Sequence, residues 1–166
     1  GVKKNGMAAL AGPALLKAAT GETALSEELG GSEMHASVTG LVEYLADDDK
    51  QALKIVRDLI DKLDWNTKIL KREAILYEEP IYAAEELTSI VPIDYRVPYD
   101  VRELIARIVD GSDFIDFKAQ YGVSMVCVQA KINGYACGII GNNGPIDPNG
   151  ATKSAQFIQL CDQSDI

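Results

Sequence analysis

Lys17 and Gly21 are the first residues whose types and spacing suggest chemistry. A short helix that carries a lysine and leaves through a glycine can cradle a phosphate group. Segments of this kind also serve as plain connections between elements. Residues 12–22 contain neither a Walker-type pattern nor Gly-x-Gly-x-x-Gly. The residues alone therefore leave both interpretations open, a phosphate contact or a connection without a ligand.

A nucleophile paired with a base is not evident in the sequence. The single histidine, His35, stands beside a glycine-rich stretch, where a packing or capping role is more common than catalysis. None of the many carboxylates stands in an apolar setting that would suit acid–base catalysis. We therefore assign no catalytic residue to this chain.

The acidic run Asp47–Asp49 admits two interpretations. It can bind a metal ion, or it can begin a helix, because carboxylates accept hydrogen bonds from free N–H groups and favour the positive end of the helix dipole. A cation site needs several oxygen ligands held together, and no others are fixed nearby. A lone histidine also provides no ligand cluster for zinc. We expect a helix start here and no metal.

The composition is that of a soluble globular protein. The 166 residues are 47% hydrophobic and 25% charged, with a formal charge of −9, which suits one domain or two partial ones. Phosphate backbones are bound by clustered Lys and Arg, so this charge argues against a nucleic acid partner. No run reaches the ~18 apolar residues that span a bilayer, and we expect no membrane partner.

Cys127, Cys137 and Cys161 contain no Cys-x-x-Cys pair. We expect reduced core cysteines and a cytoplasmic location. The apolar stretch Met7–Ala19 is broken by Gly12-Pro13, so no signal peptide is predicted. The chain begins with Gly rather than Met, and we expect it to be an excised piece of a longer protein.

The stretch Tyr99–Asn143 organises the chain, beginning with helical signals. Asp100 and Glu103 form a capping box at the start of a helix, and Asp110-Gly111 can end it. A second short helix is expected within residues 113–122.

A β-hairpin is predicted next. Asn133-Gly134 is the strongest short hairpin signal, because both residues tolerate positive φ. The strands that it joins are expected at Val123–Ile132 and Tyr135–Gly141.

Other helices are predicted from apolar periodicity and end signals, at residues 14–19, 45–63, 83–89 and 151–162. The 45–63 helix is the clearest, with one apolar face made of Leu53, Val56, Leu59, Ile60 and Leu63. In the last helix, which Asn149 or Asp147 can cap, one face holds Ala155, Ile158 and Cys161. Three prolines within residues 64–98 favour a linker there.

Several of these motifs together resemble the carboxyltransferase (β) subunit of biotin-dependent acyl-CoA carboxylases. They are residues 101–112, Phe117-Lys118 with Tyr121-Gly122, Gly134-Tyr135, Gly141-Asn142-Asn143-Gly144 and residues 12–22. The resemblance implies a partial α/β fold of the crotonase-like (ClpP/crotonase) type. Residues 1–63 would end the N-terminal half, 64–98 would be a linker, and 99–166 would start the C-terminal half.

The resemblance also implies a reaction, the transfer of CO2 from carboxybiotin to the α-carbon of an acyl-CoA. Negative charge then develops on two oxygens, which backbone N–H donors must stabilise. In the family these donors are two glycine-rich helix starts, and we expect both to lie outside this chain. The fragment alone is expected to be inactive.

The site residues implied by the resemblance form two groups. The acyl-CoA side consists of Lys17, Ala18, Ala19, Thr20, Gly21 and Glu22. The acyl or biotin pocket consists of Gly141, Asn142, Asn143 and Gly144. The Asn-Asn-Gly version of this second motif is more similar to methylcrotonyl- or geranyl-CoA carboxylases than to the propionyl-CoA branch.

The implied cofactors are biotin on a carrier partner and coenzyme A as the substrate thioester. The implied partners are a biotin carboxylase or biotin-carrier subunit and further copies of the parent protein. Two alternatives stay open. One is a non-catalytic module that binds CoA or pairs with another subunit, and the other is a carboxyltransferase subunit of a biotin-dependent decarboxylase.

Overall fold

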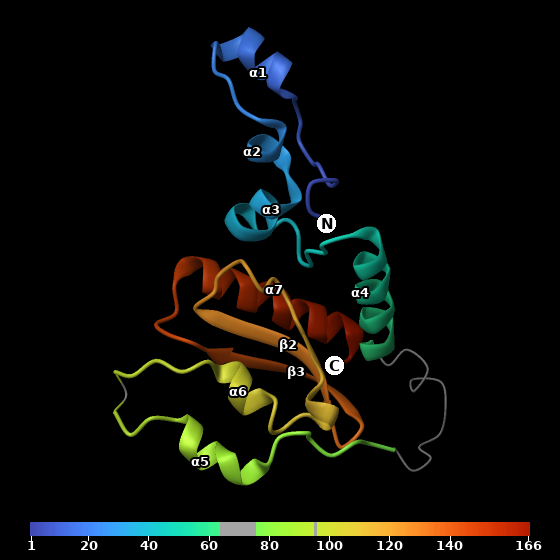
Figure 1. Cartoon of the computed structure of the whole chain (residues 1–166), viewed down its shortest axis with the longest axis vertical. Helices are drawn as coiled ribbons and strands as arrows, with labels where there is room; N and C mark the ends of the chain where they lie inside the picture. Colours follow the sequence, from blue (N-terminus) through green and yellow to red (C-terminus); the bar gives the residue numbers. More distant parts are fainter. Residues whose placement is uncertain (64–75, 95) are drawn as a thin grey trace. The chain divides into compact units, whose positions relative to one another are not determined.

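The chain forms two compact units in a computed structural model that describes residues 1–63, 76–94 and 96–166 (Figure 1). The first unit comprises Gly1–Val56 and Lys118–Tyr121, and the second comprises Arg57–Phe117 and Gly122–Ile166. Part of the expected linker, residues 64–75 and 95, lies outside the described residues.

The first unit is built from short helices with few buried side chains. They are α1 (Pro13–Thr20), α2 (Ser26–Gly30), α3 (Ser32–Met34), the π-helical turn η1 (His35–Thr39) and the first part of α4 (Asp49–Lys62). Pro13 opens α1, where its missing N–H costs nothing. Gly21 closes it at φ 78°, donating its N–H to Lys17 O at 3.0 Å. The predicted helix and its stop are confirmed.

Helix α4 begins at the acidic run, as the sequence predicts. Asp48 Oδ1 accepts a hydrogen bond from the Gln51 N–H at 2.7 Å, which is the geometry of a helix cap. Three of the five residues on its predicted apolar face are exposed. Leu53, Val56 and Ile60 are 59%, 51% and 60% exposed in the described chain. Amphipathic periodicity identifies an apolar helix face, but it does not show which surface packs against that face.

The second unit contains a three-stranded antiparallel sheet in the order β1-β2-β3. Its strands are β1 (Phe114–Asp116), β2 (Met125–Ile132) and β3 (Tyr135–Asn142). The hairpin turn has Asn133 at φ 51° and Gly134 at φ 79°, as expected for this pair of residues. The predicted hairpin is confirmed, with β2 beginning two residues later and β3 ending one residue later than expected.

The second short helix expected within residues 113–122 is wrong. Phe114 pairs with Ala130 and Asp116 pairs with Val128, so this segment begins as the edge strand β1. Phe117 N–H continues the ladder by donating to Cys127 O at 2.8 Å. Local pattern had favoured a helix, but pairing with a buried central strand supplies backbone partners that a short helix would lack.

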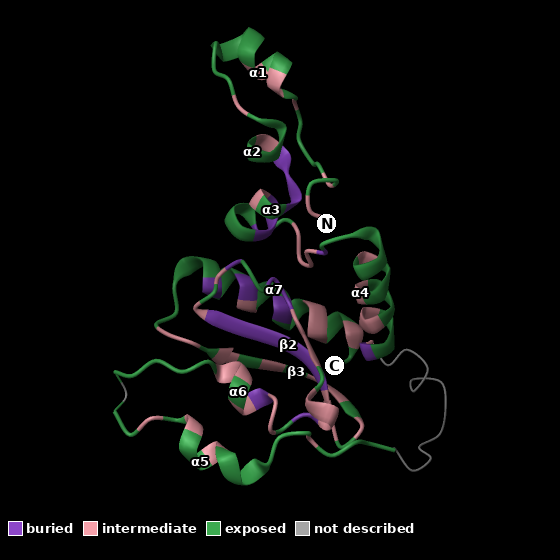
Figure 2. Cartoon of the chain, viewed as in Figure 1, coloured by how far each residue is buried: buried purple, intermediate pink, exposed green. Residues whose placement is uncertain are grey.

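Helices cover both faces of the sheet. Alternate residues of β2 pack on one side against Ile105 and Val109, which belong to and follow α6 (Val101–Ile105). The other side faces α7 (Pro148–Ser164), where Phe157 lies 5.5 Å from Phe117 between ring centroids. Figure 2 shows β2 buried along most of its length. The remaining helical turns are η2 (Ala84–Glu86), α5 (Leu87–Ile90) and η3 (Asp110–Ser112).

Helix α7 is longer than predicted and buries a different face. Asp147 caps it by accepting the Gly150 N–H at 2.6 Å, which confirms one of the two expected caps. Ile158, expected on the packed face, is 57% exposed, whereas Lys153 is buried. Lys153 is retained in the interior because its ammonium donates to Met125 O at 2.9 Å. Hydrophobicity alone could not have selected that face.

Candidate functional site

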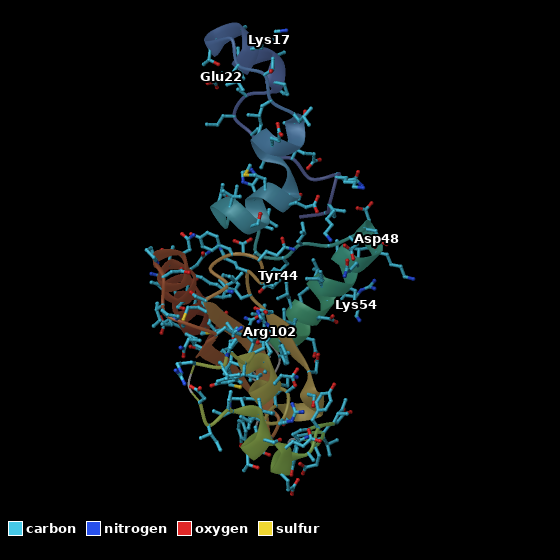
Figure 3. All side chains as sticks on the ribbon, turned by 60° about the vertical axis from the view of Figure 1, so that its left-hand side comes forward. Lys17, Glu22, Tyr44, Asp48, Lys54 and Arg102 are labelled. Atoms are coloured by element: carbon cyan, nitrogen blue, oxygen red, sulfur yellow. The ribbon has the colours of Figure 1, made fainter. Side chains whose placement is uncertain are left out.

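The first candidate group, Lys17–Glu22, lies at the exposed C-terminal end of α1. None of the α1 residues is buried, and Figure 3 shows the Lys17 and Glu22 side chains at this end of the first unit. Thr20 Oγ1 donates to Leu16 O at 3.0 Å and accepts the Glu22 N–H at 3.3 Å. These bonds set the path of the chain out of the helix. The lysine is thereby presented to solvent on an ordered turn.

The second candidate group, Gly141–Gly144, follows the last residues of β3. Gly141 faces α6, and a Cβ built there would lie 2.7 Å from Val101 Cγ2, so the close approach of β3 to α6 needs a glycine. Asn142 is exposed and donates from Nδ2 to Gly144 O at 3.1 Å. Gly144 has open space where a side chain would stand. Asn142 is therefore the exposed member of this group, and there is open space beside Gly144.

Asn143 has a different role from its neighbour. Its backbone N–H donates to Ser124 O at 2.9 Å, and its side-chain Oδ1 accepts the Val101 N–H at 2.8 Å. Its Nδ2 donates to Asp100 Oδ1 at 3.1 Å. The carboxamide thus joins the loop to the start of α6. Sequence reasoning treated the two asparagines alike, because the contact with α6 crosses more than forty residues of chain.

Charged side chains extend this connection from α6 to β1. Arg102 Nε donates to Asp116 Oδ2 at 2.6 Å, and Arg102 Nη1 lies 3.2 Å from Asp100 Oδ1. Partial burial raises the pKa of Asp100. Hydrogen bonds from the Arg102 N–H and the Asn143 carboxamide, together with the Arg102 charge, lower it more, so the pKa of Asp100 lies below its ordinary value. Burial likewise works to lower the pKa of Arg102, but Asp116 and Asp100 raise it above the ordinary value. The predicted Asp100 cap is confirmed, but Glu103 pairs with Arg107 and does not complete the predicted capping box, and the sequence did not predict this network.

His35 is held by the fold. Its Nε2 lies 2.7 Å from Ala8 O, and its Nδ1 lies 2.8 Å from Thr39 Oγ1. Because a carbonyl oxygen only accepts, Nε2 carries the proton in this arrangement. Both ring nitrogens are used, which fits a packing role rather than proton transfer. Within the three described ranges, no group of three or more His, Cys, Asp or Glu side chains is placed to bind a metal.

The three cysteines are free thiols packed in the second unit. Burial raises the pKa of each thiol, Cys127, Cys137 and Cys161, above its ordinary value. A thiol with a raised pKa carries less thiolate at neutral pH, so these side chains are poor nucleophiles. Core packing is the role that the structure gives them.

The two candidate groups belong to different units. Lys17–Glu22 lies in the first and Gly141–Gly144 in the second. The structure joins Gly141–Gly144 to Asp100 and Val101, which are both in the second unit.

The fold class is α/β and crotonase-like, shared with solved carboxyltransferase structures. The chain belongs to the family described as "Carboxyl transferase domain", which it matches over residues 1–166. Among the helices that the structure describes, none combines the length and the apolar composition needed to cross a membrane.

Named relatives agree with this assignment. The chain is 45% identical over 170 residues to the mitochondrial methylcrotonoyl-CoA carboxylase beta chain of Arabidopsis thaliana, covering 99% of this chain and 29% of that protein. The geranyl-CoA carboxylase beta subunit of P. aeruginosa is 49% identical, with a TM-score of 0.53 over 98% of this chain and 30% of that one. The transcarboxylase 12S hexamer, solved with hydrolysed methylmalonyl-coenzyme A bound, is 35% identical with a TM-score of 0.85, over 97% and 32%. The chain therefore spans less than a third of the length of these relatives.

Proposed function

We propose that this chain is part of a carboxyltransferase that moves CO2 from carboxybiotin to the α-carbon of an acyl-CoA. The observation that carries the proposal is the family match over residues 1–166. The chain's own residues contribute binding surfaces to this reaction rather than a catalytic base. His35 and the cysteines are engaged in packing, which is consistent with that division.

The acyl-CoA side of the site is Lys17–Glu22 in this proposal. Coenzyme A carries phosphates, and an exposed lysine attracts them by charge. The α1 exit holds Lys17 at the end of a helix closed by Gly21, so the ammonium is presented from an ordered position. Lys17 supplies affinity for the CoA moiety and takes no part in bond making.

The acyl or biotin pocket includes Gly141–Gly144 in this proposal. Biotin, carried by a partner subunit, supplies the carboxyl group. The donor set of the loop fits its ureido group in kind, because the Asn142 carboxamide is exposed and the Gly144 backbone has open space beside it. Asn142 and Gly144 would contact the ligand, and Asn143 would hold the loop.

The acyl group that we propose is branched or terpenoid. Identity reaches 45% and 49% with the methylcrotonoyl- and geranyl-CoA carboxylase chains, against 35% with the methylmalonyl-CoA-binding transcarboxylase. The proposed partners are a biotin-carrying subunit and further copies of the parent protein. A cytoplasmic location remains part of the proposal and is tested by cell fractionation.

The experiment is a substrate panel on the full-length parent protein with its biotin-carrying partner. Methylcrotonyl-CoA, geranyl-CoA and propionyl-CoA are each supplied with ATP and bicarbonate. We expect the two longer acyl groups to be carboxylated with the higher kcat/KM. Binding of acyl-CoA without any carboxylation would instead favour the non-catalytic module. Biotin-dependent removal of CO2 from a carboxylated acyl-CoA, without net carboxylation, would favour the decarboxylase subunit.

A further inference from the structure

We infer that Asn143 is a positioning residue for the proposed pocket, holding the Gly141–Gly144 loop against the start of α6. This inference rests on the proposed function, because it assigns a role within the same site. Asn143 does not contact the ligand in this account. It acts through the neighbouring Asn142, which is exposed, and Gly144, which has open space beside it, and these two residues would form the wall of the proposed pocket.

The anchoring contacts come from both ends of the Asn143 carboxamide. Oδ1 accepts the Val101 N–H at 2.8 Å, and Nδ2 donates to Asp100 Oδ1 at 3.1 Å. The Val101 N–H stands at the start of α6, where backbone donors have no partner within the helix. Its hydrogen bond to Asn143 is partly buried. Its loss leaves a donor without its protein partner in a place that water reaches poorly.

Asp100, which accepts the hydrogen bond from Asn143, is itself held by Arg102. Asp100 accepts the Arg102 N–H at 3.0 Å, and Arg102 Nε donates to Asp116 Oδ2 at 2.6 Å in β1. The loop is therefore tied through α6 to the opposite edge strand of the sheet. Because Asn143 directly follows Asn142, the last residue of β3, its side-chain bonds restrain the path of the chain that leaves the strand.

Only a carboxamide fits this position. It must accept from a backbone N–H and donate to a carboxylate at the same time, and asparagine has one group of each kind. Asn143→Asp keeps the acceptor but turns a carboxylate toward Asp100, where like charges repel. Adding Asp100→Asn relieves this repulsion, because the new carboxamide at residue 100 can donate to the carboxylate introduced at residue 143.

The test compares variants of the full-length protein with its biotin-carrying partner. Asn143→Asp is measured alone and together with Asp100→Asn. Asn133→Ala is the matched control, because Asn133 holds φ 51° in the turn at the opposite end of the β2–β3 hairpin. An alanine there is strained and lowers the melting temperature without touching the loop. The readouts are kcat/KM for the acyl-CoA and the melting temperature.

We expect Asn143→Asp to lower kcat/KM about tenfold, which is the scale of one lost charge-sensitive hydrogen bond. The Asn133→Ala control should keep its kcat/KM at a similar fall in melting temperature, and Asp100→Asn should restore most of the activity lost in Asn143→Asp. Two results with an active wild-type protein would overturn this inference alone. In one, Asn143→Asp keeps its kcat/KM; in the other, the loss of kcat/KM only follows the fall in melting temperature, as it would in any destabilised variant. A wild-type protein without carboxyl transfer would overturn the proposed function and this inference together.

Discussion

The carboxylate of Asp110 accepts a hydrogen bond from the Gly134 N–H at 2.6 Å, and it also accepts the Asn133 N–H at 2.7 Å. One side chain thereby satisfies both backbone donors of the hairpin turn. Asp110 was expected only to end the preceding helix. That expectation is wrong, because α6 ends at Ile105, and the carboxylate instead joins the connection after α6 to the tip of the β2–β3 hairpin.

Removing this carboxylate should destabilise the second unit. Hydrogen bonds to a charged group contribute about 1.5–3 kcal/mol each, and Asp110→Ala loses two in a partly exposed setting, so we expect a loss of about 2 kcal/mol in the free energy of unfolding. Urea unfolding measures it. Glu79→Gln, which removes a charge from an exposed side chain, is the control and should change stability little. Equal stability of the two variants would refute this role of Asp110.

Gly138 and Cys161 make a second stability test. A Cβ at Gly138 would lie 2.5 Å from Cys161 Sγ and 3.1 Å from a ring carbon of Phe157. Gly138→Ala should therefore destabilise the chain by about 1–3 kcal/mol through overpacking. Adding Cys161→Ala should recover part of that loss by removing the sulfur. For Gly144→Ala, where no atom lies within 4 Å of the new methyl group, we expect little change. A fully tolerated Gly138→Ala variant would contradict the packing of α7 on β3.

Acid should weaken the α6 network through Asp100. The folded-state pKa of this carboxyl lies below its ordinary value, so below that ordinary value the unfolded chain binds the proton more readily than the folded chain does. The stabilisation is complete above about pH 4 and is lost as pH falls through the folded-state pKa. As the pH is lowered from 7 to 3, the melting temperature should fall more steeply for wild type than for Asp100→Asn. Parallel curves for the two proteins would argue against the network.

The thiols should react slowly in the folded protein. Burial raises the pKa of Cys127, Cys137 and Cys161, so little thiolate is present at pH 7.5. We expect iodoacetamide to modify Cys127 slowest, because it is the fully buried member of the three. Urea should release all three for rapid labelling. Rapid modification of Cys127 without denaturant would contradict its place under α7.

Lys17 provides a test of the proposed CoA contact. In the full-length protein, Lys17→Ala should raise KM for the acyl-CoA about three- to tenfold, which is the scale of one charge-assisted contact at a surface. The effect should shrink as salt is added, because screening weakens exposed charges. Lys54→Ala removes an exposed lysine from α4 and serves as the matched control, and both side chains are visible in Figure 3. If both variants raise KM equally, Lys17 has no specific contact.

The exposed apolar face of α4 has a consequence in solution. Leu53, Val56 and Ile60 lie on one side of the helix and remain accessible in the described chain. Exposed apolar groups of this kind promote association. We expect the chain alone to self-associate in light scattering, and Val56→Lys should reduce the apparent mass. A monodisperse wild-type monomer would contradict this expectation.

Sequence reasoning succeeded where the signal was local. The Asn133-Gly134 turn, the Gly21 stop and the Asp147 cap each depend on residues a few positions apart, and each is present. It failed where distant segments decide the outcome. Strand β1 exists because β2 offers it backbone partners, and Lys153 is buried with its ammonium donating a hydrogen bond to Met125 O. No pattern within one segment records those partners.

In the candidate site too, the local motif was found from the sequence, but the contacts between distant segments were not. The family motif drew attention to Asn142 and Asn143 together, since they are adjacent and identical in type. Their different roles depend on Asp100 and Val101, which lie more than forty residues earlier in the chain. Asn143 could have been singled out only by knowing that β3 ends beside the start of α6.

Carboxyl transfer itself is the most direct test of the proposed function. The full-length protein and its biotin-carrying partner are incubated with ATP, labelled bicarbonate and methylcrotonyl- or geranyl-CoA. We expect label in the acyl-CoA product that depends on the partner and disappears when avidin sequesters biotin. Acyl-CoA that remains unlabelled while the partner itself becomes carboxylated would contradict the assignment as a carboxyltransferase.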